Sequence, residues 1–464
     1  MKKTAMLFSL ILLIVVGTSL ISLAAKPEQP YAGATLKVLG TRMPPVESWV
    51  YFAEKTAQEM GIKLETQWLT ADGISNKIIL DRKAGVNTWD IVYVNELDLP
   101  TFISQKAIHP INEFLKNKKV VDPNLNLDDF IFMEGVTSDG TWGAKGSIWG
   151  FPWLYTGPVL AYRTDLFSNK EEQAAFRKRY GYALKVPETY DQFRDVAEFF
   201  TRKKGEKLCG ATLTENFYGT SHSGKPAFFL WNDYINYMEA FNGQLYNKKT
   251  MQPTWNSPNV IKSVNFMKSL VPFMPPNWNA IGSGESTAYF VDGKVAMIPE
   301  YQDRVISMAI AQNSKIVDKW DYELLPSVPG TGINHATLLS LNVMGIYGLS
   351  KNKEAAYKLM EKMNKFDYQK EKLVKWGQAP TCKSVMDDAD FVKSLPKYLQ
   401  KSTVYNDPKV HLFVFDRLPI YNEMVDIVGT SLSEALSGTI SVEAALNKGQ
   451  EKLVTLFKKN KYIK

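Results

Sequence analysis

From Ala34 onward, short apolar runs alternate with segments whose apolar residues recur at helical spacing. Residues 35–40 (TLKVLG) form a compact apolar run that predicts a strand. Between residues 49 and 60 the apolar positions repeat every three or four residues, which predicts an amphipathic helix. Gly61 follows directly and is the residue type that most often ends a helix.

The same alternation continues through the next thirty or so residues. Residues 62–69 predict a second strand, a helix is expected from Ile74 to about Lys83, and 89–94 predict a third strand. Strands and helices that alternate at this interval indicate a parallel sheet flanked by helices. Because ligands bind beyond the carboxyl ends of such strands, the loops 41–47 and 95–99 are expected at a binding edge.

The later chain is dominated by helical patterns. Thr189 with Gln192 has the spacing of a capping box that opens a helix. A strand is expected at 208–214, and further helices at 227–243, 257–270, 352–365 and 431–457. No internal repeat or low-complexity linker separates the two halves, so the chain is expected to cross more than once between two units.

Residues 146–167 (GSIWGFPWLYTGPVLAYRTDLF) crowd aromatic rings around chain-breaking residues. Pro152 and Pro158 restrict the backbone on both sides of a short segment. A buried core strand does not need these prolines, and an exposed loop does not favour the rings. The combination indicates a hinge beside a ligand cleft.

The amino terminus has the pattern of a secretory signal. Lys2 and Lys3 precede a long apolar run, and small residues then offer a cleavage site after Ala24 or Ala25. An uncleaved membrane anchor is the alternative, because the run is nearly long enough to span a bilayer. No cysteine follows the run, so no lipid anchor is expected.

Composition describes a globular protein, with 45% hydrophobic and 22% charged residues in 464. The formal charge of +7 is spread over the chain without a basic stripe, so nucleic acid is not an expected partner. Four histidines lie far apart and have no metal-ligand spacing, so neither a metal nor a cofactor is expected. Whether Cys209 and Cys382 form a disulfide stays open.

Several segments, in order, resemble the extracellular solute-binding proteins of sugar ABC transporters, the family that includes maltose-binding protein. The segments that carry the resemblance include WDIVYVNELDL, AIHPINEFLKN, IWGFPWLYTGPVLAYRTDLF, YFVDGKVAMIPEYQDR, YELLPSVPG, APTCKSV and SLSEALSGTISVEAALNKGQEKL. Each is a soft pattern, but their order is specific and spans nearly the whole chain after the signal segment. One departure is HATLLSLNVMG, which lacks a tryptophan that relatives often carry there.

The resemblance implies an α/β fold of the two-lobed periplasmic-binding-protein type, with doubly wound sheets joined by a multi-crossing hinge (type II). Crossings are expected near residues 155, 292 and 345. The expected division is a signal peptide at 1–24, lobe I at 33–155 plus 293–345, and lobe II at 156–292 plus 346–464.

The resemblance also implies a carbohydrate site in the interlobe cleft. Carboxylates and amides bind adjacent hydroxyl groups of a sugar, and aromatic faces pack on its C–H patches. The candidate ligand-binding residues are Arg42, Asn95, Glu96, Trp153, Tyr155, Tyr218, Trp231, Asn232, Trp278, Glu300, Tyr301 and Trp376. For the tryptophans and Tyr155, packing inside a lobe core is the alternative.

The expected protein is therefore an exported, periplasmic or extracytoplasmic binding component of an ABC importer rather than an enzyme. It is expected to be a monomer that delivers a mono- or oligosaccharide or a polyol to membrane permease subunits. The alternatives are a secreted glycosidase that uses paired carboxylates, a binder of a non-sugar solute, and a sensory protein that reports ligand occupancy to a receptor.

Overall fold

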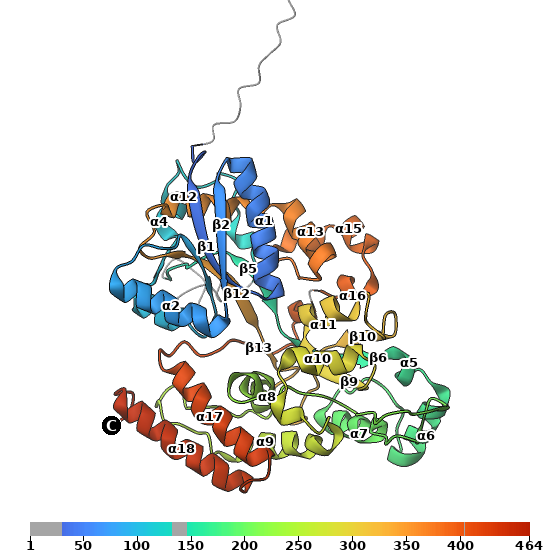
Figure 1. Cartoon of the computed structure of the whole chain (residues 1–464). Helices are drawn as coiled ribbons and strands as arrows, with labels where there is room; N and C mark the ends of the chain where they lie inside the picture. The colour runs from blue at the N-terminus through green and yellow to red at the C-terminus, as the bar shows by residue number, and fades with distance from the viewer. Residues whose placement is uncertain (1–29, 132–145, 403) are drawn as a thin grey trace, which may run out of the picture.

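The computed structural model describes residues 30–131, 146–402 and 404–464, and its ribbon divides into two lobes, one above the other in Figure 1. The expected signal segment lies outside these residues. The upper lobe contains a six-stranded sheet of order β2-β1-β3-β12-β4, with β5 paired to β12. Its strands are β1 (Thr35–Thr41), β2 (Lys63–Leu69), β3 (Ile91–Val94), β4 (Ile108–His109), β5 (Pro152–Thr156) and β12 (Ser340–Tyr347).

The amino-terminal βαβ pattern predicted from the sequence is confirmed. Strand β1 pairs in parallel with both β2 and β3. The first helix, α1 (Pro44–Met60), ends where Gly61 adopts a left-handed backbone at φ 68° and caps the last turn. The other helices of this lobe are α2 (Ala71–Ala84), α3 (Leu99–Ser104), α4 (Asn112–Lys116), α12 (Lys353–Lys362), α13 (Phe366–Trp376) and α14 (Lys383–Asp387).

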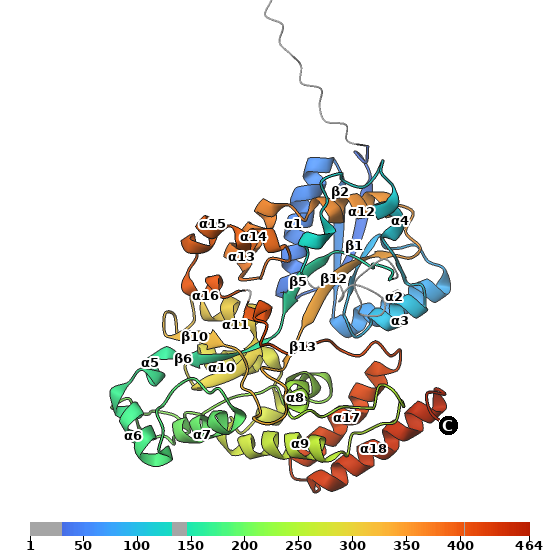
Figure 2. The same ribbon diagram turned by 180° about the vertical axis from the view of Figure 1, so that it is seen from behind.

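The lower lobe is built around a three-stranded sheet of order β10-β6-β9. Its strands are β6 (Pro158–Arg163), β9 (Met297–Tyr301) and β10 (Trp320–Glu323), and the two-residue strands β7 (Lys207–Leu208) and β8 (Ala211–Thr212) form a separate hairpin. Its helices are α5 (Thr164–Phe167), α6 (Lys170–Tyr180), α7 (Tyr190–Phe200), α8 (Phe228–Ala240), α9 (Pro258–Leu270), α10 (Ser283–Val291), α11 (Gln302–Ala309), α17 (Tyr421–Leu436) and α18 (Val442–Lys459). Figure 2 shows α17 and α18 side by side at the carboxyl end of the chain.

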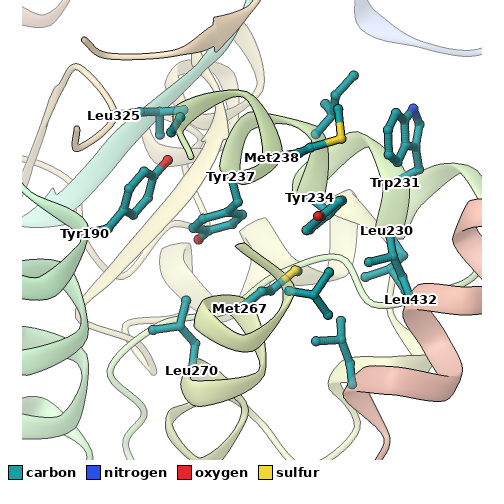
Figure 3. Packing of buried hydrophobic residues seen from close by; sticks show 14 of the residues in the cluster. Tyr190, Leu230, Trp231, Tyr234, Tyr237, Met238, Met267, Leu270, Leu325 and Leu432 are labelled. Atoms are coloured by element: carbon teal, nitrogen blue, oxygen red, sulfur yellow. The ribbon is translucent and has the colours of Figure 1, made fainter. Parts of the chain in front are cut away.

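Side chains alternate across the three-stranded sheet, so each face of β6 contributes to a different core. Leu160 belongs to a large cluster with α7, α8, α9 and α17, whereas Val159 and Ala161 belong to a cluster with α10 and α11. Figure 3 shows part of the first cluster, in which Trp231 and Tyr234 of α8 lie above Met267 of α9. The capping box predicted at the start of α7 is present and confirmed.

The chain first crosses between the lobes at Gly157. Strand β5 ends at Thr156 in the upper sheet, and β6 begins at Pro158 in the lower sheet. The Gly157 carbonyl accepts a hydrogen bond from Tyr405 Oη and another, at 3.0 Å, from the Gln302 backbone N–H. The breaks that predicted a hinge therefore mark a real change of sheet.

Replacing Gly157 with alanine is expected to lower the free energy of unfolding by about 1–3 kcal/mol. A Cβ atom there would lie 2.7 Å from the Leu338 carbonyl oxygen, so the crossing would have to shift. Urea unfolding followed by circular dichroism measures the effect. The control is Gly284→Ala, because nothing lies within 4 Å of that Cβ position. A free energy of unfolding in Gly157→Ala equal to that of the wild type would contradict this packing.

The expected lobe boundaries differ from the packing at two places. Residues 293–339 were expected in lobe I, but β9 and β10 pair with β6 in the lower sheet. The chain passes back into the upper sheet only at β12, and α12, expected in lobe II, packs against β12 and α1. No crossing lies near residue 292. The chain crosses at about residue 339, between β11 (Thr337–Leu338) and β12, close to the crossing expected near 345, and it returns to the lower lobe after α14.

Two predicted elements were also wrong. The strand expected at 208–214 is the β7–β8 hairpin, because Cys209 and Gly210 both have positive φ and turn the chain. The single helix expected at 431–457 is divided between α17 and α18, with Gly438 at φ 74° in the turn between them.

The remaining elements lie beside the junction of the lobes. They are α15 (Ala389–Ser394), α16 (Lys397–Gln400) and β13 (Leu412–Phe413), which pairs in parallel with β11. Both cysteines are free thiols: Cys209 packs against the lower core and Cys382 belongs to the upper core. The disulfide that the sequence left open is therefore absent from this structure.

Candidate functional site

The loop after β3 holds a buried carboxylate at the junction of the lobes. Asn95 Oδ1 accepts the Leu97 N–H at 3.0 Å and closes the turn. Glu96 is 8% exposed, and its carboxylate accepts hydrogen bonds from Ser340 Oγ and from the Leu341 N–H at the start of β12. This loop, predicted at the binding edge of the sheet, is thus fixed to the strand that connects the lobes.

A loop of the lower lobe reaches up to the same place. Arg417, between β13 and α17, donates from Nη1 to the Glu96 carbonyl oxygen at 3.3 Å. Asn422 in the first turn of α17 donates from Nδ2 to Asp98 Oδ1 at 3.1 Å. Burial raises the pKa of the Glu96 carboxyl to about 7, although the Ser340 hydrogen bond and the Arg417 charge oppose that shift.

A second buried carboxylate lies on β9 of the lower lobe. Glu300 accepts hydrogen bonds from Thr287 Oγ1 at 2.7 Å, the Tyr301 N–H at 2.8 Å and Arg304 Nη1 at 3.0 Å. Burial raises the pKa of Glu300 to about 7; Arg304 opposes the rise, and the nearby Asp233 charge adds to it. This acid at the end of β9 and its arginine in the first turn of α11 therefore form a charge pair four residues apart.

Tyr301 connects Glu300 to helix α8. Its hydroxyl donates to Asn232 Oδ1 at 2.8 Å, and its ring is 9% exposed. Burial raises the pKa of Tyr301 well above its usual value, and the charge on Glu96 adds to the rise. Glu96, Asn232, Glu300 and Tyr301, four of the predicted binding residues, are therefore brought together from both lobes.

A small cavity adjoins these residues on the lower lobe. It has a volume of about 10 Å³, room for one water molecule rather than a sugar. Its lining is largely polar and aromatic and includes Tyr190, Asn232, Asp233, Asn236, Tyr237, Glu300 and Tyr301. The cavity itself is therefore too small to hold a sugar.

We expect the two carboxyls to make stability depend on pH. Their pKa values rise from 4.5 to about 7 on folding, so the folded state binds more protons between those values. The free energy of unfolding should then fall as pH rises from 5 to 7, by up to about 1.4 kcal/mol per pH unit for each group. Urea titrations of the wild type and Glu300→Gln measure this contribution; equal slopes in both proteins would contradict it.

Trp231 was expected at the cleft, and the structure places it in the lower core instead. Its side chain has no exposed area, its indole N–H donates to Tyr421 Oη at 3.1 Å, and its ring lies 6.1 Å from that of Trp255. Trp278 is likewise buried against the backbone of Gly224. The Trp231 ring has its faces occupied by protein because α8 is enclosed on almost every side.

Trp153 and Tyr155 were also expected to project into the cleft. Trp153 is 3% exposed, donates from Nε1 to Ser48 Oγ at 2.9 Å and packs on Phe52. Tyr155 has no exposed area and lies near the ring of Tyr405. The two rings lie within the protein on the α1 and α16 side of the junction, where they support the crossing strand.

Three further candidates keep part of their side chains exposed and lie away from the Glu96–Tyr301 group. Arg42 lies 4.1 Å above the Trp68 ring and pairs with Glu47. Tyr218 lies near Tyr289, and Trp376 packs against α1.

Sequence reasoning missed the residues that hold the two acids. Ser340 contacts Glu96 across 244 positions of sequence, and no local pattern announces such a contact. Asp233 and Arg417 were equally unmarked. Arg304 lies only four residues after Glu300, but the pair spans the end of β9 and the start of α11, so the spacing rule for ion pairs within a helix does not apply to it.

Within 30–131, 146–402 and 404–464, no group of three or more His, Cys, Asp or Glu side chains is arranged to hold a metal ion. In those same stretches no helix is both long and apolar enough to span a membrane.

The two lobes, the crossing strands and the polar group at their junction define a periplasmic-binding-protein fold. The chain belongs to the bacterial extracellular solute-binding protein family, whose sequence profile matches residues 51–400. A "Probable ABC transporter-binding protein" of Deinococcus radiodurans is 24% identical over 255 residues, which are 54% of this chain and 55% of that protein. The match to this curated relative thus spans only about half of its length.

Solved structures share the fold over nearly the whole chain. An ABC transporter solute-binding protein from Agrobacterium radiobacter K84, in complex with ribitol, has a TM-score of 0.74 at 23% identity, covering 92% of this chain and 99% of that one. Maltose-bound MalE3 of T. maritima has a TM-score of 0.72 at 20% identity, covering 91% and 100%. The predicted fold class and family are therefore confirmed.

Proposed function

We propose that this protein is the exported solute-binding component of an ABC importer and that it binds a sugar or a polyol between its lobes. The proposal rests on one observation at the junction of the lobes: Glu96 of the upper lobe lies close enough to Tyr301 of the lower lobe for its charge to raise the Tyr301 pKa, and the Tyr301 hydroxyl donates to Asn232. A binding group divided in this way is completed only when the lobes are close together.

The chemistry of the group suits a polyhydroxylated solute. A carboxylate or an amide can bind two adjacent hydroxyl groups, and a tyrosine adds a hydroxyl and an aromatic face. Each acid has a basic neighbour, Arg417 for Glu96 and Arg304 for Glu300. A neutral ligand is therefore favoured over a strongly charged one. The ribitol and maltose bound by two proteins of the same fold support this class.

Binding would work by a population shift between open and closed lobes. The solute contacts both lobes only in the closed form, so it favours that form by its differential affinity. Strands β5 and β12 and the segment around Gly157 connect the lobes, and they would bend during closure. The closed protein would then be recognised by the permease subunits in the membrane.

The remaining features of the proposal follow the sequence. Processing after Ala24 or Ala25 would release a monomer outside the cytoplasm, and no cofactor or chemical step is needed for binding. Arg42, Asn95, Tyr218 and Trp376 would extend the contact to a longer solute as the lobes close. They remain candidates on the strength of their partial exposure.

Isothermal titration calorimetry of the purified mature protein with ribitol, mannitol, glucose and maltose tests the proposal. At least one of these ligands is expected to bind with a dissociation constant below about 100 μM and to raise the melting temperature as its concentration passes that constant. Failure of every sugar and polyol, with binding of an amino acid or a polyamine instead, would overturn the proposed solute class.

The same samples test the glycosidase alternative. Glu96 and Glu300 are two carboxyls that exchange protons near neutral pH, as a paired-carboxylate enzyme would require. Maltose is expected to be recovered intact after prolonged incubation. Release of glucose that is lost in Glu96→Gln and in Glu300→Gln would show catalysis and contradict simple binding.

A further inference from the structure

Helix α13 buries two polar side chains beside Tyr368 and Leu373, while two of its apolar side chains are exposed. Gln369 and Lys372 have no exposed area and share one face of the helix with Trp376. Val374 is 54% exposed and Phe366 is 40% exposed. Burying an amide and an ammonium in place of these apolar side chains is unfavourable unless the polar atoms find partners.

The side-chain oxygen atoms of Gln369, on this face, and of Gln378, just beyond the end of α13, are already occupied. Gln369 Oε1 accepts the Thr381 N–H at 3.0 Å, and Gln378 Oε1 accepts from Ser48 Oγ at 2.7 Å. Ser48 Oγ in turn accepts the Trp153 indole N–H at 2.9 Å. Both buried amides thus use their oxygen atoms within the protein.

The side-chain amide and indole N–H donors on this face and at the end of α13 have no partners among the described residues. Within the part of the chain that the structure describes, Gln369 Nε2, Gln378 Nε2 and Trp376 Nε1 are buried and have no hydrogen-bond partner. Lys372 Nζ donates to the Trp153 carbonyl oxygen and lies 4.7 Å from the centre of the Trp153 ring. No ion pair between described residues includes Lys372. Three N–H donors that lack partners among those residues thus lie on α13, or just beyond its end, together with this buried amine.

We propose that the donor cluster formed by Gln369, Lys372, Trp376 and Gln378 binds a small monovalent anion, either an inorganic anion or a carboxylate. An anion is a ligand that accepts hydrogen bonds and donates none. It also supplies the negative charge that would pair with the Lys372 ammonium group. Ser48, which holds Gln378, lies near the amino end of the 17-residue helix α1, whose dipole favours negative charge there.

Only Trp376 of the donor cluster is also a candidate for contact with a longer solute; the other three residues lie outside the proposed solute site, and the cluster borders the junction of the lobes. A Cβ atom on Gly377 would lie 2.5 Å from Cγ2 of Ile306, on α11 of the lower lobe. Leu373 and Ala379 belong to the same apolar cluster as Ile306. Occupation of the cluster would therefore stabilise the end of α13 where it meets the other lobe.

Protonation of Lys372 should accompany anion binding. Burial lowers the pKa of Lys372 to about 7. Burial and the Asp129 charge raise the pKa of the nearby Cys382 thiol to about 12, although Lys372 opposes this rise. The thiol therefore stays uncharged. An anion favours the ammonium form, so binding takes up a proton. The affinity for the anion should therefore fall as pH rises above about 7.

Thermal unfolding in sodium bromide tests the proposal, with sodium methanesulfonate keeping the ionic strength constant. Above its dissociation constant, bromide is expected to raise the melting temperature of the solute-free wild-type protein by about 1–3 °C per tenfold increase. The shift should be smaller at pH 9 than at pH 6. It should disappear in Lys372→Met and persist in Lys375→Met, a matched change at an exposed lysine of the same helix.

Crystals soaked in bromide provide a second measurement that does not depend on the folding of a variant. An anomalous peak within hydrogen-bond distance of Lys372 Nζ and Gln378 Nε2 is expected. Competition of bromide by acetate and galacturonate would assign the site to a carboxylate, and competition by chloride and nitrate alone would assign it to an inorganic anion. Absence of the peak, or an equal bromide shift in Lys372→Met, would overturn the proposal without affecting the sugar titrations.

Discussion

Replacing Trp231 with alanine is expected to lower the free energy of unfolding by about 3–5 kcal/mol. The ring has no exposed area, packs against Tyr234 and Trp255, and loses its hydrogen bond to Tyr421 when it is removed. Because the ring does not reach the junction of the lobes, the affinity for the solute should change less than threefold in protein that remains folded.

Urea unfolding and calorimetric titration of the same preparation separate the two roles of Trp231. The matched control is Phe228→Ala, an aromatic residue on the same helix that is 36% exposed and should cost less than about 1 kcal/mol. If Trp231→Ala abolished solute binding while keeping the wild-type stability, the ring would face the ligand and its placement in the core would be contradicted.

Changes at Tyr301 are expected to have the largest effect on solute binding. Removing only the hydroxyl in Tyr301→Phe should raise the dissociation constant about 5- to 20-fold, because Asn232 loses its donor and the solute loses a hydrogen-bonding group. Removing the ring in Tyr301→Ala should raise the constant at least 100-fold, since the apolar contact is lost as well.

Tyr289 provides a control that matches the chemistry of Tyr301. Its hydroxyl also donates to an asparagine, Asn277 Oδ1 at 2.9 Å, but on an exposed surface of the lower lobe. Calorimetric titration of Tyr289→Phe should give the wild-type dissociation constant. Wild-type affinity in Tyr301→Ala would show that this residue does not contact the solute, and it would contradict the lower half of the proposed site.

Local structure and the first crossing were predictable because the responsible residues are neighbours in sequence. Gly61 ends α1, Thr189 and Gln192 cap α7, and the prolines around Gly157 mark the change of sheet. The second crossing has no such signal. The chain passes from Leu338 to Ser340 without a proline or a glycine, so its place depends on distant strand pairing that sequence reasoning could not see.

The binding group was half predictable for a related reason. Glu96 follows β3, where the parallel part of the upper sheet is expected to place ligands. Glu300 and Tyr301 instead end β9 of the antiparallel lower sheet, and only the family resemblance pointed to them. The tryptophans could not be assigned in this way, because a helix such as α8 is buried on nearly all sides and its periodicity does not distinguish core from cleft. Only the packing of Trp231 on Trp255 resolves the choice.

A crystal structure of the protein with its tightest-binding sugar or polyol would show where the solute binds. We expect the solute between the lobes, with hydroxyl groups within about 3.2 Å of the Tyr301 or Asn232 side chain on one side and of Glu96 on the other. A well-ordered solute held by one lobe alone, with these three side chains contacting only water, would contradict this expectation.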